Sequence, residues 1–350
     1  MTEMVKKMKW FISASVLTVL ILIAVFSHDS MEALQEDDEQ KGLSDQIVIK
    51  FSHVVAENTP KGLAAEKFAE LIAKRTDGKI KVEIFPNEIM YSDEQELAAL
   101  KRGDVQMIAP SYSKMTEVIP EWQVLDLPFL FRSEEHVETV YTGEIGQRLL
   151  SKLEDENMKG LALWGNGFKQ MTSSSGTLIQ PEDFAGQRFR IMPSDTIAKQ
   201  FELLGGIPKA ASFNDVYIAL EGNEFDGQEN TISNIYSKGF YRLQKNMTLS
   251  NHGYLGYSVL MNKEFWNSLD PELQIHIEKA MNDTTKWMLS ESKEMNETQL
   301  RRMRENSKLG IHELSPDERK EWQKVFQPLY QSYTERYGDE WIEDIRKAGK

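Results

Sequence analysis

Beyond a polar segment that ends near residue 45, short apolar runs alternate with longer amphipathic ones along the chain. Residues 47–51 (IVIKF) and 80–84 (IKVEI) have the length and composition of strands, and the second alternates apolar with charged residues. Between them Ala65, Phe68 and Ile72 recur at the spacing of one helix face. Residues 105–109 add a third apolar strand. This order predicts a mostly parallel sheet with covering helices.

Capping signals indicate where further helices begin and end. Ser92 and Gln95 have the spacing of a capping box, which predicts a helix from there to about residue 101. Asp270 followed by Pro271 starts a helix that we expect to run to about Ser307. Such a helix is roughly 55 Å long at ~1.5 Å per residue, enough to cross between two lobes. Additional strands are expected at 161–163 and 188–192, and additional helices after Ser194 and at 214–221.

The N-terminal residues resemble an export segment. Lys6, Lys7 and Lys9 precede an uncharged, mainly apolar run over residues 10–26. At ~1.5 Å per residue this run spans roughly 25 Å, slightly short of a comfortable membrane crossing. No sharp small-x-small cleavage site follows it, so residues 1–27 are predicted to be either a signal peptide or an uncleaved N-terminal anchor. Residues 28–45 are polar and acidic and are predicted to form a tether.

Charge and composition exclude several classes of function. The 41 basic and 55 acidic residues give a net charge of −14, which opposes non-specific binding to nucleic acid. The absence of cysteine excludes disulfides, thiolate metal sites and a lipid-modified N-terminal cysteine. The six histidines are scattered, and the chain has no nucleophile elbow and no phosphate-binding loop. We therefore expect no catalysis, no cofactor and no metal.

Two basic residues stand out as candidates for binding an anion. Arg190 lies inside an apolar strand, where a guanidinium requires a partner, and its planar fork suits bidentate capture of a carboxylate. On these residues alone, however, an internal ion pair with one of the many acidic residues is the favoured interpretation. Lys169 follows a strand end, where open α/β sheets place ligand groups, although a solvated loop lysine is the simpler interpretation.

Several longer stretches resemble a known family. They include FSHVVAENTPKG (51–62), EIFPNEIMYSDEQELAALKRGDVQMIAPS (83–111), VLDLPFLF (124–131), PEDFAGQRFRI (181–191), FNDVYIALEGNEFDGQEN (213–230), SNIYSKGFYRLQK (233–245) and NHGYLGYSVLMNKEFW (251–266). Together they are similar to the solute-binding proteins of tripartite ATP-independent periplasmic (TRAP) transporters, in the C4-dicarboxylate-binding DctP group. The resemblance runs from about residue 47 to 345.

This resemblance implies an α/β fold like that of type II periplasmic binding proteins, with two lobes, hinge strands and one long helix across both. Lobe I would comprise residues 46–167 plus 256–300, and lobe II residues 168–255 plus 301–350. Closure of the lobes over an organic acid would bury the ligand.

The resemblance also implies a set of ligand-binding residues. Arg190 matches the arginine that pairs with a carboxylate, Asn230 the asparagine that hydrogen-bonds it, and Phe213 the aromatic residue beside it. Lys169 matches a second basic position, often an arginine elsewhere in the family. Asn58, Ser111 and Tyr236 belong to loops that face the cleft. Gly165 departs from related dicarboxylate binders, which can carry a bulkier polar residue there.

The function implied is that of an exported, monomeric, non-enzymatic receptor in the periplasm or on the outer face of the cytoplasmic membrane. It would capture succinate, fumarate or malate and deliver it to the small and large membrane subunits of a TRAP transporter. Two alternatives remain open at the level of sequence: another carboxylate-bearing solute, or a sensing component that uses the same cleft without transport.

Overall fold

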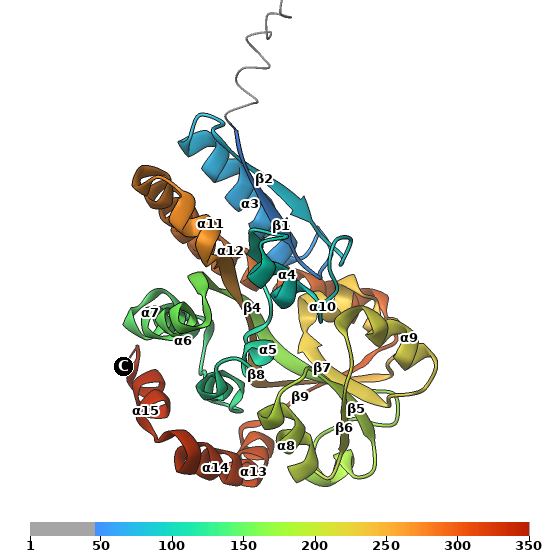
Figure 1. The fold of residues 1–350 in the computed structure, drawn as a ribbon. Coiled ribbons are helices and arrows are strands. Elements are labelled where there is room, and N and C mark those ends of the chain that lie inside the picture. Colours follow the sequence, from blue (N-terminus) through green and yellow to red (C-terminus); the bar gives the residue numbers. More distant parts are fainter. Residues whose placement is uncertain (1–45, 350) are drawn as a thin grey trace, which may run out of the picture. The chain divides into compact units, whose positions relative to one another are not determined.

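One mixed sheet of nine strands organises residues 46–349, the part of the chain that this computed structural model describes (Figure 1). The strands run in the order β2-β1-β3-β8-β4-β7-β5-β6, and β9 pairs with β8. Their bounds are β1 Ile47–Ser52, β2 Ile80–Phe85, β3 Met107–Ile108, β4 Met158–Ser173, β5 Arg188–Ile191, β6 Ile207–Ala210, β7 Gly227–Thr231, β8 Asn246–Asn262 and β9 Gly310–Glu313.

The first three strands form the parallel group that the hydrophobic pattern predicts. β1 pairs with β2 from Ile47 opposite Ile80 onward, and β3 joins β1 on its other side. Helix α3 (Pro60–Arg75) connects β1 to β2, and the Thr59 side chain caps it by accepting from the Gly62 N–H. This group of strands, with α3 and α4 (Glu96–Arg102), is called the β1 lobe below.

The start of α4 corrects the sequence analysis. The predicted capping box at Ser92 places the helix start too early, because α4 begins at Glu96 and Gln95 is its N-cap. The Gln95 side chain does reach back to the Ser92 N–H at 3.3 Å, but it does so across a turn that precedes the helix. Two residues that were expected inside the helix, Asp93 and Glu94, therefore belong to this turn.

A second group of strands forms the other side of the sheet and is called the β5 lobe. β5 pairs in parallel with both β6 and β7. Helix α8 (Asp195–Leu203), α9 (Val216–Glu221) and α10 (Ile232–Ser237) connect or follow these strands. Ser194 caps α8, as expected, by accepting from the Ile197 N–H. Figure 1 shows the β1 lobe above and the β5 lobe below, with β4 and β8 running between them.

Two long antiparallel strands, β4 and β8, connect the lobes. β4 has 16 residues and β8 has 17, and their pairing is interrupted by irregularities near Gly160, Gly165 and Lys169. β4 and β8 run antiparallel to each other, β4 runs antiparallel to β7, and β8 runs antiparallel to β3 but parallel to β9, so the sheet is mixed. The lobe boundaries predicted after residues 167 and 255 fall opposite each other, since Gly167 pairs with Leu255. The division into lobes at these residues remains a prediction.

The longest helix, α12, contacts elements of both lobes. It runs from Pro271 to Asn306 with Asp270 as N-cap and Ser307 as C-cap, which agrees with the bounds predicted from sequence. It packs against α3 on the β1 side, along β4, and against α10 on the β5 side. The helix thus spans the two lobes as the family resemblance implied.

The remaining helices cover the edges of this framework. In the C-terminal part, the Arg148 guanidinium binds Glu340 and Asp344, both at 2.6 Å, so α15 is tied to α7. The bounds are α5 Tyr112–Met115, α6 Glu134–Thr142, α7 Glu144–Ser151, α11 Lys263–Ser268, α13 Pro316–Val325, α14 Gln327–Tyr337 and α15 Glu340–Lys347, with short 3-10 turns η1 Pro120–Asp126, η2 Lys152–Glu156, η3 Pro181–Phe184, η4 Phe213–Asp215 and η5 Phe240–Arg242.

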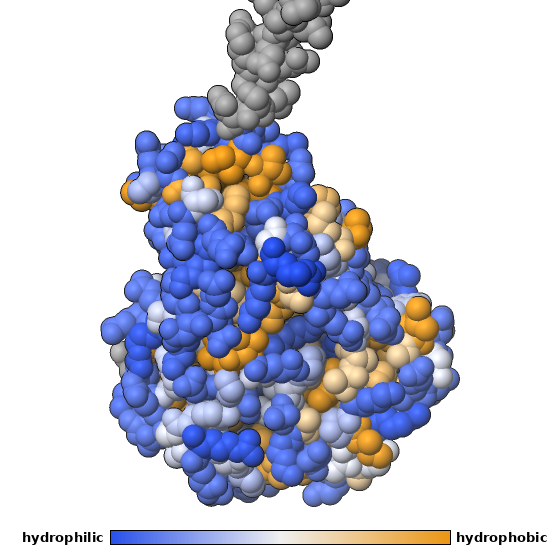
Figure 2. All heavy atoms as spheres, viewed as in Figure 1, coloured by the Kyte–Doolittle hydropathy of each residue, from blue (hydrophilic) through white to orange (hydrophobic). Residues whose placement is uncertain are grey.

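Buried apolar side chains form three clusters on the sheet faces and beneath the helices. The face shown in Figure 2 is mostly hydrophilic, with apolar residues in separate small areas, one of them over α9. Among residues 46–349, no helix combines the length and apolar character that a membrane crossing requires. The predicted export segment at 1–27 and the acidic tether at 28–45 lie outside the described residues.

Candidate functional site

A narrow cavity, called the inner cavity, lies where the β1 lobe faces the β5 lobe. Its volume is about 30 Å³. The β1 lobe and α5 form one wall of this cavity, and the β5 lobe forms the opposite wall. Strand β8 forms the floor between them. The lining residues are Val54, Val55, Lys61, Asp93, Ser111, Lys114, Arg190, Met192, Phe213, Asn230, Asn234, Leu255 and Tyr257. Four of the seven predicted site residues, Arg190, Asn230, Phe213 and Ser111, are among them.

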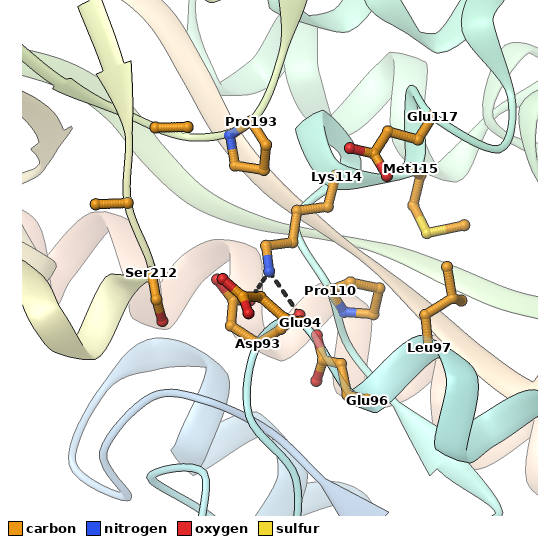
Figure 3. Close-up of a pocket in the computed structure, with 12 residues that line it drawn as sticks. Asp93, Glu94, Glu96, Leu97, Pro110, Lys114, Met115, Glu117, Pro193 and Ser212 are labelled. Carbon is orange, nitrogen blue, oxygen red and sulfur yellow. Dashed lines mark hydrogen bonds and ion pairs between the residues drawn. The ribbon is translucent and has the colours of Figure 1, made fainter.

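An outer cavity of about 300 Å³ adjoins the inner one and shares Asp93 and Lys114 with it. Figure 3 shows this outer cavity between the start of α4, with Glu96 and Leu97, and two segments of the β5 lobe, one after β5 with Pro193 and one after β6 with Ser212. The Lys114 ammonium lies 2.5 Å from the Asp93 carboxylate and also donates to the Asp93 carbonyl. The two cavities therefore form one polar region between the lobes.

Arg190 is a buried cation whose charge is not neutralised by direct contact with any carboxylate of residues 46–349. Its side chain is 2% exposed, and its Nε and Nη2 both donate to the Ala211 carbonyl, at 2.9 and 2.7 Å. No described carboxylate lies within ion-pairing distance, and Nη1 makes no hydrogen bond to any described residue. Burial lowers the pKa of Arg190 to about 10, although Asp93 and Glu229 act in the opposite direction. The internal ion pair that sequence alone allowed is therefore absent from the described residues.

Asn230 presents amide hydrogens to the same cavity. Its Oδ1 accepts from the Thr231 N–H at 3.1 Å and from Asn234 Nδ2 at 2.8 Å. Because these two donors fix the oxygen, the amide nitrogen points elsewhere, and it has no acceptor among the described residues. Arg190 and Asn230 lie on neighbouring parallel strands, β5 and β7. Together they offer unsatisfied N–H donors to an anionic ligand, and carboxylates are the acceptors such donors bind best.

Phe213 and Ser111 complete the part of the lining that sequence predicted. Phe213 is 8% exposed and packs edge-on against Phe240, with ring centroids 6.1 Å apart. Ser111 precedes α5, and its hydroxyl forms no capping hydrogen bond with that helix. An apolar ring and a hydroxyl-bearing side chain thus line the same cavity as Arg190 and Asn230.

Lys169 lies outside the cavity lining. It is 1% exposed, and its Nζ donates to Glu229 Oε1 at 2.6 Å. The other oxygen of Glu229 accepts from His252 at 2.7 Å. Burial raises the pKa of Glu229, but Lys169 and His252 outweigh that effect and hold it well below its usual range. The charge of Lys169 is therefore matched within the fold, and direct contact with a ligand stays a prediction.

Asn58 and Tyr236 also lie outside both cavity linings. Asn58 is exposed in the loop between β1 and α3. Tyr236 is half-buried and stacks on Tyr241, with ring centroids 5.5 Å apart and the rings nearly parallel. Their roles in ligand binding remain predictions.

Sequence reasoning missed the polar residues on the β1 side of the cavities. Lys61 is fully buried although it is a lysine, and its position continues the apolar stripe of Ala65, Phe68 and Ile72. A cation at the head of an apolar helix face was a signal that could have identified it. Asp93 and Glu96 had no such signal, because acidic residues are abundant in this chain.

Residues 51–336 match the DctP family, described as bacterial extracellular solute-binding protein, family 7. The chain is 48% identical over 330 residues to the C4-dicarboxylate-binding protein DctB of Bacillus subtilis, covering 94% of each chain. It is 42% identical over 307 residues to the C4-dicarboxylate-binding periplasmic protein DctP of Rhodobacter capsulatus, covering 87% of this chain and 92% of that one.

A TRAP periplasmic solute-binding protein from Shewanella oneidensis, solved with bound succinate, has a similar structure. The two structures superpose with a TM-score of 0.84, and the two sequences are 40% identical. The match covers 87% of this chain and 100% of the Shewanella oneidensis chain. This likeness confirms the α/β, two-lobed fold that the sequence predicted.

Proposed function

Because the chain belongs to the DctP family of bacterial extracellular solute-binding proteins, we propose that it captures a C4-dicarboxylate such as succinate, fumarate or malate between its lobes. Membership of a family of binding proteins also confirms that the chain is not an enzyme. The choice of a four-carbon diacid follows from the C4-dicarboxylate-binding relatives and from the succinate bound in the similar structure.

The buried guanidinium of Arg190 is the observation that carries this proposal. An isolated charge is costly to bury, so a side chain that is 2% exposed and has no carboxylate partner in the described part of the chain is expected to bind an external anion. Its free Nη1 and the free amide of Asn230 supply donors from two neighbouring strands. One carboxylate bound there would neutralise Arg190 and satisfy both residues.

The size of the inner cavity agrees with a receptor that opens and closes. Its volume of about 30 Å³ holds about two water molecules, so a four-carbon acid does not fit without displacement of the lining. Walls from two lobes that are joined by strands β4 and β8 allow such displacement through hinge motion. Closure over the ligand would exclude water and strengthen its contacts with the charged groups.

Lys169 contributes to the site through Glu229 in this proposal. Glu229 adds negative charge near Arg190, and Lys169 offsets much of that charge by its buried hydrogen bond with Glu229. Lys169 thereby keeps the potential around Arg190 favourable for an anion. This role requires no contact between Lys169 and the ligand.

A thermal-shift panel tests the proposed ligand class. Succinate, fumarate and malate at about 100 times their dissociation constants should each add about 2.7 kcal/mol to the free energy of unfolding. Butyrate serves as the matched monocarboxylate, because it has the chain length of succinate with one carboxylate replaced by a methyl group. Stabilisation by butyrate with no effect of the three diacids would refute the dicarboxylate assignment.

We further propose that the receptor works outside the cytoplasm and passes its ligand to the membrane subunits of a TRAP transporter. The family description and the names of the similar proteins support the location. We infer that residues 10–26 direct export and stay attached as an anchor, since the sequence has no cysteine that could carry a lipid anchor instead. Intact-mass measurement of the membrane-associated protein tests the anchor, and a mass that lacks the first 30 or so residues would refute it.

A further inference from the structure

Two buried polar groups on the β1 side of the cavities have unsatisfied hydrogen-bonding capacity. Glu96, the first residue of α4, is 1% exposed, and neither of its carboxyl oxygens has a hydrogen-bond partner among the described residues. Lys61 is fully buried, and its Nζ makes one hydrogen bond within residues 46–349, to the Ala109 carbonyl at 2.9 Å. Buried carboxyl and ammonium groups normally have partners, so both residues indicate a missing one.

The two groups face the same polar region. Lys61 lines the inner cavity and Glu96 the outer one, and the two cavities share Asp93 and Lys114. Lys61 and Glu96 are near enough to shift each other's pKa, yet no ion pair within 4.0 Å joins them. The Lys61 ammonium lies 4.0 Å from the centroid of the Tyr257 ring, which lines the same cavity.

Their neighbours are already paired. Asp93 and Lys114 form a close ion pair, so neither needs a ligand to neutralise its charge. Across the cavity, Arg190 is the anchor for the first carboxylate. The lining of the inner cavity thus contains two cations that no described carboxylate contacts directly, Arg190 in the β5 lobe and Lys61 in the β1 lobe.

We propose that Lys61 and Glu96 form a distal subsite for the second carboxylate of the bound acid, with Lys61 as its cation and the Glu96 carboxyl as a hydrogen-bond donor. This inference rests on the proposed function, because it requires a first carboxylate at Arg190. It assigns the selection of diacids over monoacids to residues of the β1 lobe, so the ligand itself would link the two lobes.

Burial favours the protonation state that this role requires. Burial raises the pKa of Glu96 to about 8, although the nearby Lys61 ammonium acts to lower it, so the carboxyl is protonated and able to donate near neutral pH. Burial also lowers the pKa of Lys61, while the nearby Glu96 acts against that effect. The other charged or titratable groups that act on this pair, or on which it acts, are Asp93, Glu88, Lys114 and His53.

The experiment compares succinate with butyrate by calorimetric titration of the full chain and its variants. Lys61→Met keeps the apolar stem and removes the charge. It should weaken succinate binding at least about 30-fold, which is typical for loss of one partner of a buried charge pair. Butyrate affinity should stay within about threefold, because butyrate has no second carboxylate for Lys61 to bind. Lys67→Met is the matched control, since Lys67 lies on the same helix but pairs with Glu70 at the surface.

Glu96 variants identify the role of its carboxyl even if Lys61→Met fails to fold. Glu96→Gln keeps a neutral donor and should bind succinate within about threefold of wild type near neutral pH. Glu96→Ala removes the donor and should weaken succinate about 10-fold or more, as expected for a hydrogen bond to a charged group. Tighter succinate binding by both variants would show that Glu96 is ionised and repels the ligand, and would overturn its role as donor.

The pH dependence gives a second readout. Wild-type affinity for succinate should fall as the pH rises through the raised pKa of Glu96, because the donor proton is then lost. Glu96→Gln should lose that part of the dependence, and butyrate binding should not show it.

The outcomes separate this inference from the proposed function. If wild type binds none of the diacids, the proposed function itself fails. If wild type binds succinate, and Lys61→Met and Glu96→Ala keep its preference for succinate over butyrate, the distal subsite is refuted while the function stands.

Discussion

Replacing Lys169 by methionine should destabilise the protein strongly. Lys169 and Glu229 are almost fully buried, with side chains 2% and 1% exposed, and their hydrogen bond is 2.6 Å long. The variant leaves the Glu229 carboxylate in the interior, where its remaining partners are His252 at 2.7 Å and the Gln200 amide at 3.5 Å. Breaking a buried pair in this way typically costs about 3–5 kcal/mol, because an uncompensated charge stays behind.

The expected change in melting temperature follows from the size of the folded unit. About 300 described residues, at ~2.1 cal/mol/K each, give an unfolding entropy of roughly 0.6 kcal/mol/K. A loss of about 3–5 kcal/mol therefore corresponds to a decrease of roughly 5–8 °C. Scanning calorimetry of ligand-free protein measures this decrease.

A double variant shows whether the unpaired carboxylate is the cause. Lys169→Met combined with Glu229→Gln removes both charges and should recover most of the lost stability, because no buried charge remains. Lys199→Met is the control, since Lys199 forms a surface pair with Glu202 and should change stability by less than about 1 kcal/mol. The reasoning is refuted if the single variant melts within 1 °C of wild type. It is also refuted if adding Glu229→Gln lowers the free energy of unfolding again by as much as Lys169→Met alone does.

Two other perturbations follow from the same framework. Gly165→Ala should lower the free energy of unfolding by about 1–3 kcal/mol, because the new Cβ would lie 2.6 Å from the Tyr254 hydroxyl and 2.8 Å from Leu289 Cδ2. Succinate affinity should not change. An unaltered melting temperature would contradict this packing argument. Acid should destabilise the protein, because the pKa values of His252 and Glu229 are lowered in the folded state. The unfolded chain takes up a proton at the histidine below about pH 6.5, and another at the glutamate below about pH 4.5, so stability falls as each is passed. Glu229→Gln should flatten the loss below pH 4.5 in urea titrations at several pH values, and an unchanged slope would refute the assignment.

Much of the fold could be predicted from short-range patterns. The ends of α12 were predicted closely, because an N-cap residue followed by proline is a strong local signal and the helix is long. β1 and β2 were found from their apolar patterns. The extent of β4 and β8 was not, because long strands that pass from one lobe to the other have irregular pairing and no single alternating pattern.

The candidate site divides in the same way. Arg190 was identified from a charge inside an apolar strand, a purely local contradiction, and the structure places it in the cavity lining. The sequence could not show that Glu229 pairs with Lys169, because that contact joins residues 60 positions apart. It equally gave no means to select Glu96 among 55 acidic residues, since burial without a partner is a tertiary property.

Calorimetric titration of succinate into an Arg190→Met variant tests the central claim most directly. Loss of a buried charge partner should weaken binding roughly 30- to 5,000-fold. The matched control is Arg188→Met, on the same strand, where the exposed arginine pairs with Asp226, and it should bind within about threefold of wild type. A folded Arg190→Met protein that binds succinate as tightly as wild type would contradict the account.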